Sequence, residues 1–181
     1  HTDMTFSAEP PMGSFLRAVE VPEVGGDTCW GSCTAAFEAL DEELQNRLKN
    51  LEAVHSFEYG FKESIAEKGR EAFREILEKN PPVKHPVVRT HPESGREGLF
   101  VNRLFTTHIE GLDPGESAEL LEFLYQHMLK EEFTVRFRWQ KNSIAIWDNR
   151  CTIHKPVNDY FPHYRHLRRI TVKGDRPFFK E

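Results

Sequence analysis

The first residues of the chain combine two side chains that can bind a metal ion. His1 and Asp3 are two positions apart, and residues at this spacing point to the same side of a β-strand. We expect residues 2–6 to form such a strand, so that the imidazole and the carboxylate could share one ion. Two histidines and one carboxylate on one face of a metal, with the other positions open, suit Fe(II) and O2 chemistry. The pattern therefore predicts a metal site that needs one more histidine.

His154 has the best context for the third ligand among the nine histidines of the chain. It follows the apolar segment 143–147, which we expect to be a buried strand, so its side chain could enter the mouth of a barrel. His163 and His166 are the competing candidates, but they lie in a polar and aromatic segment. For any single histidine here, a surface or hydrogen-bonded imidazole is the ordinary alternative.

Arg165 and Arg169 are four residues apart and would share one face of a regular strand, with Arg168 on the other face. Guanidinium groups that face a protein interior are costly unless anions neutralise them. Two anionic ligands would meet that requirement. A solvated strand with charges on both faces explains the same spacing, so the arginines alone leave both interpretations open.

Short strands with helical insertions must position these residues. Alternating patterns predict further strands at 14–21, 86–90, 98–102, 133–139, 143–147 and 167–173. Apolar residues at helical spacing predict helices at 34–51, at 64–79 and from 114 to about 130. Asp113 should cap the last helix, and residues 91–95 should form a hairpin turn. This order of elements indicates a β-barrel or β-sandwich core with attached helices.

The composition argues against several classes of protein. The chain has 181 residues and a formal net charge of −5, so it lacks the basic surface that nucleic-acid binding requires. No uncharged apolar run approaches the roughly 18 residues that indicate a membrane span. Three cysteines, Cys29, Cys33 and Cys151, are too few for a disulfide framework and favour free thiols in the cytoplasm.

Several distinctive blocks of sequence follow one another along the chain. The first are H-T-D-M-T-F at 1–6, E-P-P at 9–11 and G-G-D-T at 25–28. The later ones are N-P-P at 80–82, H-P-V-V-R-T-H-P at 85–92, F-V-N at 100–102, F-T-T at 105–107 and A-I-W-D-N-R at 145–150. In this order they resemble the taurine dioxygenase family, the TauD/TfdA branch of the 2-oxoglutarate-dependent dioxygenases. The resemblance is closest to the taurine-type members.

The resemblance implies roles for the metal and cosubstrate residues. His1, Asp3 and His154 match the three iron ligands of the family. Arg165 matches the arginine that pairs with the distal carboxylate of 2-oxoglutarate. Thr28 matches the threonine that assists this arginine, although a β-branched residue in a strand needs no such role.

The resemblance also implies roles for residues around the substrate. Arg169 matches the arginine that holds the sulfonate of the substrate. Phe61 and Phe105 match aromatic positions that line the substrate pocket, and ordinary core packing would explain both equally well. Gly60 stands where the taurine-type pattern usually has a small hydroxyl residue.

The implied fold is mainly β with helical insertions around a double-stranded β-helix (jelly-roll, cupin-like) core. We expect residues 1–181 to be a single catalytic domain that lacks the N-terminal segment of the full-length protein. The implied activity is Fe(II)- and 2-oxoglutarate-dependent oxidation by O2 of a small anionic substrate, foremost taurine or a related sulfonate, with release of sulfite and an aldehyde. The same chemistry on a sulfate ester or a carboxylate, and a catalytically inactive binding relative, are the alternatives. A zinc hydrolase with this triad would leave Arg165 and Thr28 unexplained, and a homo-oligomer is expected because family members commonly form dimers or tetramers.

Overall fold

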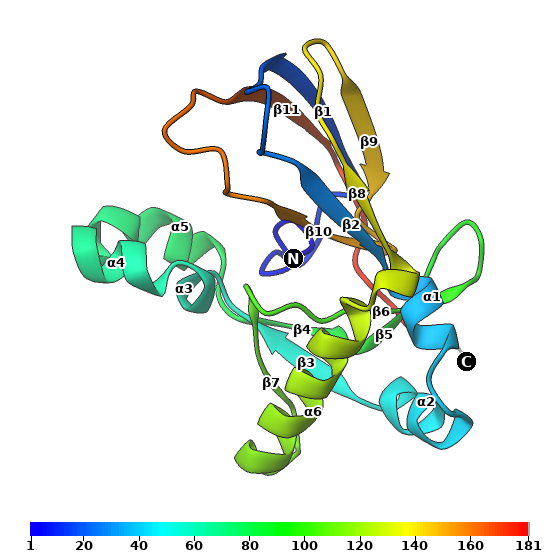
Figure 1. Ribbon diagram of the computed structural model, residues 1–181. Helices are drawn as coiled ribbons and strands as arrows, with labels where there is room; N and C mark the ends of the chain where they lie inside the picture. The colour runs from blue at the N-terminus through cyan, green and yellow to red at the C-terminus, as the bar shows by residue number, and fades with distance from the viewer. Residues whose placement is uncertain (181) are drawn as a thin grey trace.

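The computed structural model describes residues 1–180 and consists mainly of strands, with helices between them (Figure 1). Six strands form two antiparallel sheets of three strands each. The first sheet has β1 in its centre and contains β1 (Gly13–Glu20), β9 (Ile144–Asp148) and β11 (His166–Val172). The second sheet has β2 in its centre and contains β2 (Thr28–Ser32), β8 (Thr134–Phe137) and β10 (Thr152–Pro156). Each sheet therefore joins strands from the beginning and the end of the chain.

Aromatic side chains fill the space between these two sheets. The Trp30 ring on β2 lies 5.5 Å from the Trp147 ring on β9, measured between centroids. It lies 6.2 Å from both Phe137 and Trp139. Trp139 and Trp147 are buried. The two sheets thus pack face to face, and their inward side chains meet between them, in the upper part of Figure 1.

Further strands support the first two sheets from below in Figure 1. The third sheet contains β3 (Glu52–His55), β4 (Val83–Pro86) and β7 (Thr106–Ile109), with β3 in its centre. A hairpin contains β5 (Val88–Thr90) and β6 (Glu97–Leu99). This hairpin confirms the turn predicted at 91–95. The strands predicted at 14–21 and 167–173 are confirmed as β1 and β11.

Helix α6 (Pro114–Met128) begins where the sequence predicts. The Asp113 carboxylate accepts a hydrogen bond from the backbone N–H of Gly115, and Pro114 stands in the first turn, where its missing N–H breaks no helical bond. One face of the helix is buried in the main apolar core through Leu121, Leu124 and Met128. Burial of each such side chain contributes about 1.5–3 kcal/mol to folding.

The prediction of a single helix at 34–51 is wrong, because the chain leaves the helical conformation in the middle of this segment. Two helices occur instead, α1 (Cys33–Glu38) and α2 (Glu42–Lys49). The Asp41 carboxylate accepts a hydrogen bond from the N–H of Leu44 and so starts the second helix. Phe37 and Leu48 are buried on either side of the break, so the predicted apolar face survives it.

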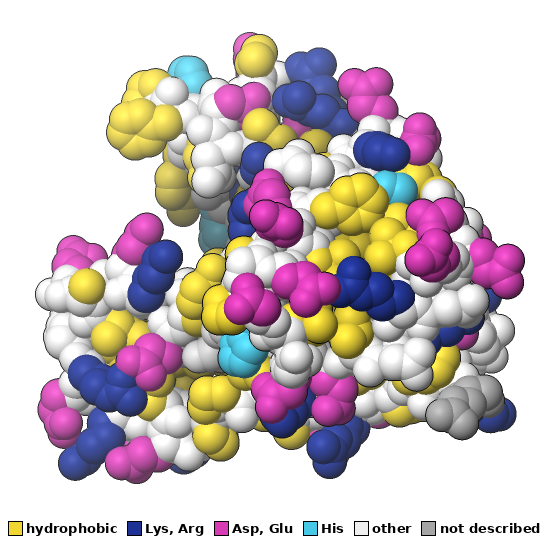
Figure 2. All heavy atoms as spheres, turned by 90° about the horizontal axis from the view of Figure 1, so that it is seen from below, with side chains coloured by type: hydrophobic (Ala, Val, Ile, Leu, Met, Phe, Trp, Pro, Cys, Tyr) yellow, Lys and Arg dark blue, Asp and Glu magenta, His cyan; other side chains and the backbone are white. Residues whose placement is uncertain are grey.

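The helix predicted at 64–79 is also divided, and it projects from the body of the molecule. We call this region the helical arm: α3 (Phe57–Gly60), α4 (Lys62–Lys68), η1 (Arg70–Phe73) and α5 (Arg74–Lys79). Gly69 ends α4 with a φ of 83°, a conformation that favours glycine. No described residue of α4, η1 or α5 is buried. Figure 2 shows a deep notch on the side from which the arm projects.

Several strand predictions need correction. Segment 86–90 is interrupted at Val87, between β4 and β5, and β6 covers only the first two residues of segment 98–102. Residues 2–6 form a turn rather than a strand, because long-range hydrogen bonds hold them in place of a sheet ladder. Phe133 ends a short helix, η2 (Glu131–Phe133), so the strand predicted at 133–139 is reduced to β8. Segment 143–147 does form a strand, β9, but Ile144 and Ile146 are exposed because they lie on the outer face of the first sheet.

None of the helices within residues 1–180 is both long enough and apolar enough to cross a membrane. The three cysteines are free, as the sequence predicts. Cys33 is fully buried, and this burial raises the pKa of its thiol well above the usual range.

Candidate active site

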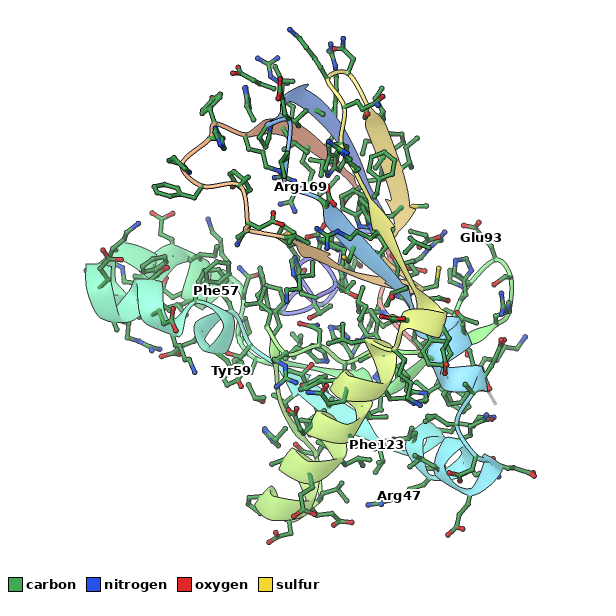
Figure 3. The ribbon with its side chains drawn as sticks, in the orientation of Figure 1. Arg47, Phe57, Tyr59, Glu93, Phe123 and Arg169 are labelled. Carbon is green, nitrogen blue, oxygen red and sulfur yellow. The ribbon has the colours of Figure 1, made fainter. Side chains whose placement is uncertain are left out.

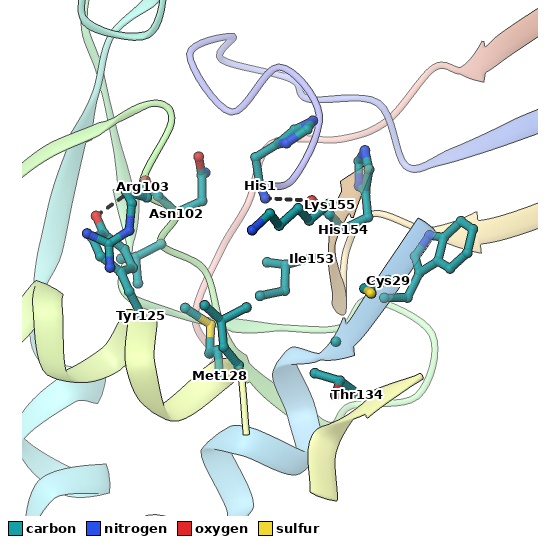
Figure 4. Close-up of a pocket in the computed structure, with 14 residues that line it drawn as sticks. His1, Cys29, Asn102, Arg103, Tyr125, Met128, Thr134, Ile153, His154 and Lys155 are labelled. Carbon is teal, nitrogen blue, oxygen red and sulfur yellow. Dashed lines mark hydrogen bonds between the residues drawn. The ribbon is translucent and has the colours of Figure 1, made fainter. Parts of the chain in front are cut away.

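The backbones of His1 and His154 form a reciprocal hydrogen-bonded pair. The main-chain amino nitrogen of His1 donates a hydrogen bond to the His154 carbonyl oxygen at 2.8 Å (Figure 4). The backbone N–H of His154 donates to the His1 carbonyl oxygen, also at 2.8 Å. His154 lies on β10 opposite Trp30 of β2, so its side chain shares the inward face with that tryptophan. The two imidazole rings are 4.3 Å apart between centroids.

Asp3 reaches the same point from the turn that replaces the predicted strand. We call residues 1–7 the ligand turn. The Thr2 hydroxyl donates to the Thr152 carbonyl oxygen at 2.9 Å, and the Ser14 hydroxyl donates to Oδ2 of Asp3 at 2.9 Å. Asp3 is only 4% exposed. Side-chain contacts to β1 and β10 therefore give this carboxylate a single orientation.

The three donor atoms surround one point. Oδ1 of Asp3 lies 3.6 Å from Nε2 of His1 and 3.6 Å from Nε2 of His154. Each of the three residues offers one ligand atom, and these atoms all lie within 4.8 Å of one another. Two imidazole nitrogens and one carboxylate oxygen fit Fe(II), and they leave coordination positions open on the metal. The structure thus brings together the three residues that the sequence selected as ligands.

The protonation states also suit a metal. Burial raises the pKa of Asp3, but hydrogen bonds and charges from its neighbours, His1 foremost, outweigh this effect and lower the pKa to about 2. Burial, with a further contribution from His1, lowers the pKa of His154 to about 4. Near neutral pH the site therefore offers a carboxylate anion and an imidazole with a free lone pair, the forms that bind metals.

Arg169 lies beside the candidate metal ligands, on the inward face of β11. It pairs with Leu16 of β1, whereas Arg168 pairs with Arg17 on the outer face, as the spacing predicts. Nη1 of Arg169 donates to Oδ1 of Asp3 at 2.9 Å, and Figure 3 shows its side chain between the sheets. A guanidinium has five N–H donors, so Arg169 can bind an anion next to the metal without giving up this contact.

Arg165 contacts Gly26, which lies two residues before Thr28 in the chain. Nε of Arg165 donates to the Gly26 carbonyl oxygen at 2.9 Å, and a Cβ on Gly26 would lie 2.9 Å from Cδ of Arg165. The guanidinium lies 5.5 Å from the centre of the Tyr160 ring, and partial burial lowers the pKa of Arg165. The Thr28 hydroxyl accepts a hydrogen bond from the Trp139 indole at 2.9 Å, so its own proton can be donated to an anion. Arg165 and Thr28 together could therefore bind a carboxylate.

Phe61 and Phe105 belong to an aromatic cluster at the base of the helical arm. We define the aromatic cluster as Phe6, Phe57, Phe61 and Phe105. The rings of Phe61 and Phe105 are 6.0 Å apart, and Phe6 lies 5.0 Å from Phe105. Phe6 belongs to the ligand turn, so the cluster adjoins the segment that carries Asp3. The structure shows both predicted residues in core packing, the ordinary role weighed for them.

A cavity of about 390 Å³ opens beside the two histidines. Its lining is mainly apolar and includes His1, His154, Asn102, Tyr125, Met128 and Ile153 (Figure 4). Cavities of about 300–1,000 Å³ commonly bind small molecules in proteins. The candidate metal ligands therefore border a space in which a small ligand could fit.

A second group of possible metal donors is explained by ion pairing. His91, Asp148 and Cys151 also lie close together. However, Oδ2 of Asp148 is 2.7 Å from Nη2 of Arg150 and 3.0 Å from Nε2 of His91, and Arg150 also pairs with Glu93. This carboxylate is already paired, and the group ties the 148–151 turn to the 91–95 turn.

Sequence reasoning missed three polar residues that support the site. Ser14 binds the Asp3 carboxylate, Trp139 binds the Thr28 hydroxyl, and Asn102 binds the ligand turn. A serine at an inward position of a strand is a recognisable signal for Ser14, because a buried hydroxyl needs a partner. Asn102 carries no comparable local signal, since its partners lie far away in the sequence.

Two facing sheets with two histidines and one carboxylate between them define a class of mononuclear metalloprotein with open metal positions. The particular family follows from a sequence model described as taurine catabolism dioxygenase TauD, TfdA family, which matches residues 1–171. The chain belongs to this family. The resemblance drawn from the sequence blocks is thereby confirmed.

Related proteins differ in the substrates that their names give. A Schizosaccharomyces pombe protein, provisionally named an alpha-ketoglutarate-dependent sulfonate dioxygenase, is 41% identical over 99% of this chain and 45% of its own length. An alpha-ketoglutarate-dependent sulfate ester dioxygenase from Pseudomonas putida is 40% identical over 98% of this chain and 60% of its own length. An alpha-ketoglutarate-dependent 2,4-dichlorophenoxyacetate dioxygenase from Cupriavidus pinatubonensis is 36% identical, with 97% and 60% covered. This chain spans about half the length of such relatives.

Solved structures share the fold. A taurine dioxygenase from Burkholderia xenovorans superposes with a TM-score of 0.84 and 38% identity, covering 98% of this chain and 59% of that one. AAD-2, solved in complex with Mn(II) and N-oxalylglycine, superposes with a TM-score of 0.86 and 30% identity, covering 99% and 70%. Nearly all of this chain therefore superposes on part of these solved structures.

Proposed function

We propose that residues 1–181 form the catalytic domain of an Fe(II)- and 2-oxoglutarate-dependent dioxygenase, built on a jelly-roll core, that hydroxylates a small sulfonate. Loss of sulfite from the hydroxylated carbon would leave an aldehyde. The observation that carries the proposal is the contact of Arg169 with the same Asp3 oxygen that faces both histidines. This contact would place an anion-binding guanidinium beside the metal.

His1, Asp3 and His154 would hold the metal. Fe(II), when bound with 2-oxoglutarate, supplies the oxidising power for hydroxylation of a C–H bond by O2. Ser14 binds the second oxygen of Asp3 and keeps the first directed at the metal position. This support is what second-layer hydrogen bonds provide in metal sites, where their loss costs about 10- to 100-fold in affinity or activity.

Arg165 and Thr28 would hold the distal carboxylate of 2-oxoglutarate. A planar guanidinium binds a carboxylate through two parallel hydrogen bonds, and a threonine hydroxyl adds a third donor. Gly26 and the Tyr160 ring keep the Arg165 side chain in one position. The proposal draws support from AAD-2, which was solved with Mn(II) and N-oxalylglycine.

Arg169 would bind the anionic group of the substrate, and the aromatic cluster would form the apolar wall of its pocket. The positive charge of Arg169 lies beside the metal ligands, so an anion bound there would bring its neighbouring carbon towards the metal. Phe61 and Phe105 would exclude water from that carbon. Positioning of this kind is the main contribution that a protein makes when a metal supplies the chemistry.

A sulfate ester is the second candidate substrate. The relatives named for sulfonates and for sulfate esters are almost equally similar to this chain, at 41% and 40% identity. Both substrates carry a tetrahedral anionic head that Arg169 could bind. A carboxylate substrate is supported by the more distant 2,4-dichlorophenoxyacetate relative, at 36%.

Succinate formation tests the proposal. The intact protein would be incubated with Fe(II), O2 and 2-oxoglutarate, with and without members of a panel of sulfonates, sulfate esters and carboxylates. We expect a sulfonate to stimulate succinate formation and to release sulfite. Release of sulfate instead would select the sulfate ester, and absence of succinate with every compound, despite bound iron, would contradict the dioxygenase assignment.

A further inference from the structure

Thr5, two residues after Asp3, anchors the ligand turn from within the core. Its side chain is fully buried. The hydroxyl accepts a hydrogen bond from Nδ2 of Asn102 at 2.9 Å, and it lies 2.9 Å from Nδ1 of His55. The Thr5 carbonyl oxygen lies 2.9 Å from Nε2 of His85. Three side chains from separate segments therefore meet at one residue of the ligand turn.

Asn102 connects this turn to Phe105 of the aromatic cluster. Its Oδ1 accepts hydrogen bonds from the backbone N–H groups of Leu104 at 3.2 Å and Phe105 at 3.0 Å. Its backbone N–H donates to the Thr106 hydroxyl at 2.9 Å. Asn102 is 3% exposed and lines the cavity together with His1 (Figure 4). The amide oxygen thus holds the turn at Leu104 and Phe105, while the amide nitrogen holds the ligand turn.

The two histidines in this network are neutral near pH 7. Burial lowers the pKa of His55 well below its usual range, and burial lowers the pKa of His85 to about 4. Nε2 of His85 lies 2.9 Å from the Thr5 carbonyl oxygen and 3.0 Å from that of Ser7, so this nitrogen carries the hydrogen and donates it. The network therefore supports the ligand turn without adding charge near the metal.

We propose that Asn102 is a positioning residue which, through Thr5, sets the distance between the metal ligands and the Phe105 side of the substrate pocket. This inference rests on the proposed function. One amide group holds both the ligand turn and the Phe105 turn, so displacement of either turn reaches the other. Misplacement of a reacting group by about 1 Å can cost roughly 100-fold in rate, so such a link matters for hydroxylation at one carbon.

Substitutions can break this link while leaving its surroundings in place. Thr5→Val removes the hydroxyl at nearly constant shape, and Thr5→Ser keeps it. Asn102→Asp retains the acceptor for the Leu104 and Phe105 N–H groups but removes the donor to Thr5. Thr107→Val is the matched control. The Thr107 hydroxyl donates to the Val54 carbonyl oxygen at 3.1 Å and does not contact the ligand turn.

Two measurements on the intact protein report the role. The first is the dissociation constant of Mn(II), by calorimetry, and the second is the amount of succinate formed per substrate oxidised. For Thr5→Val and Asn102→Asp we expect Mn(II) to bind roughly 10- to 100-fold more weakly, as for other supporting residues of metal sites. We also expect excess succinate, because a displaced substrate is oxidised less often per turnover. The double variant should lose less than the sum of the two single losses, because both substitutions remove the Asn102–Thr5 hydrogen bond.

A purely structural role predicts a different result. The proposal is overturned if Thr5→Val and Asn102→Asp leave both quantities unchanged, whatever happens to the melting temperature. It is also overturned if Thr5→Ser or Thr107→Val has the same effect as Thr5→Val. If Thr5→Val does not fold, Asn102→Asp decides by the same measurements. If the wild-type protein forms no succinate, the proposed function fails, and the Mn(II) affinities alone decide whether Asn102 and Thr5 position the metal ligands.

Discussion

The region around the candidate metal ligands and the helical arm differ in how their residues are fixed in the structure. Around Asp3 and His154, donors and backbones from several distant strands form buried hydrogen bonds. In the arm, by contrast, no described residue of α4, η1 or α5 is buried, and the Arg70–Glu58 ion pair is exposed. Segments with few buried contacts open more easily than core strands. The candidate metal ligands are therefore held more rigidly than the helical arm, which can change its position or its sequence more freely.

Removal of a metal ligand tests the rigid side of this comparison most severely. We expect Asp3→Ala to abolish both Fe(II) binding and succinate formation, because no described neighbour can supply a replacement carboxylate at this point. Asp113→Ala, which removes a surface carboxylate from the α6 cap, should retain both. Metal content and succinate yield measured on the two variants make the comparison. Full activity of Asp3→Ala would refute the metal site.

Acid should lower the free energy of unfolding through the protonation of His85. Its pKa is about 4 in the folded protein against 6.5 in a model peptide, so the unfolded chain binds more protons between these values. Stability is therefore complete above pH 6.5 and is lost as the pH falls towards 4, by about 3 kcal/mol for this group alone. Urea unfolding at pH 7 and pH 4 measures this loss. His85→Gln, which does not titrate, should lose about 3 kcal/mol less between the two pH values, and an equal loss would contradict the assignment.

Loss of the Arg169 guanidinium should weaken the binding of an anionic substrate and leave the fold intact. We expect Arg169→Ala to raise KM for an anionic substrate by roughly 10- to 100-fold, the effect of losing about 1.5–3 kcal/mol of charged hydrogen bonds. Uncoupled 2-oxoglutarate turnover should change much less. Arg168→Ala, one residue away on the outer face of the same strand, is the control and should leave KM unaltered. Steady-state kinetics on both variants decide, and an unchanged KM in Arg169→Ala would remove its role.

The smallest effect is expected where the arm meets the aromatic cluster. A Cβ at Gly60 would lie 2.5 Å from Cδ1 of Phe105, so Gly60→Ala must displace that ring. Overpacking of this kind lowers the free energy of unfolding by about 1–3 kcal/mol. Because the arm can move to relieve the contact, we expect a value near the lower end of this range. We expect a modest fall in melting temperature and a change in preference between short and longer substrates. Gly115→Ala in α6, with only the Asp113 carboxylate nearby, should change neither; an unchanged substrate preference in Gly60→Ala would separate Phe105 from the pocket.

The same division explains which parts of the fold could be predicted. Strand β1 and helix α6 follow from local periodicity and from the Asp113 cap, signals that lie within the segment itself. The helix at 34–51 was predicted too long because its apolar face continues across Asp41, although that residue starts a new helix. The prediction that segment 143–147 is buried is wrong for Ile144 and Ile146. Composition shows that a strand is apolar, but it does not show which face of the sheet is covered.

The structure corrects the reason for which the sequence indicates the candidate metal ligands. The sequence predicts that residues 1 and 3 share one face of a strand, yet they belong to the ligand turn. Contacts with Thr152, Ser14 and Asn102, all distant in sequence, bring Asp3 to the histidines. The residue types therefore indicated the chemistry, while the geometry depended on partners that no local pattern could identify.

The reciprocal backbone pair of His1 and His154 also determines when the site can form. These residues are 153 positions apart, and Arg169 is 166 positions from Asp3. Contacts between such distant residues form slowly, because closing a long loop costs entropy before any bond is made. On the ribosome, His1 and Asp3 can meet His154 and Arg169 only after the segment between them has been synthesised. A metal would then enter late in maturation, because a chain stalled before β10 would present only two of the three proposed ligands.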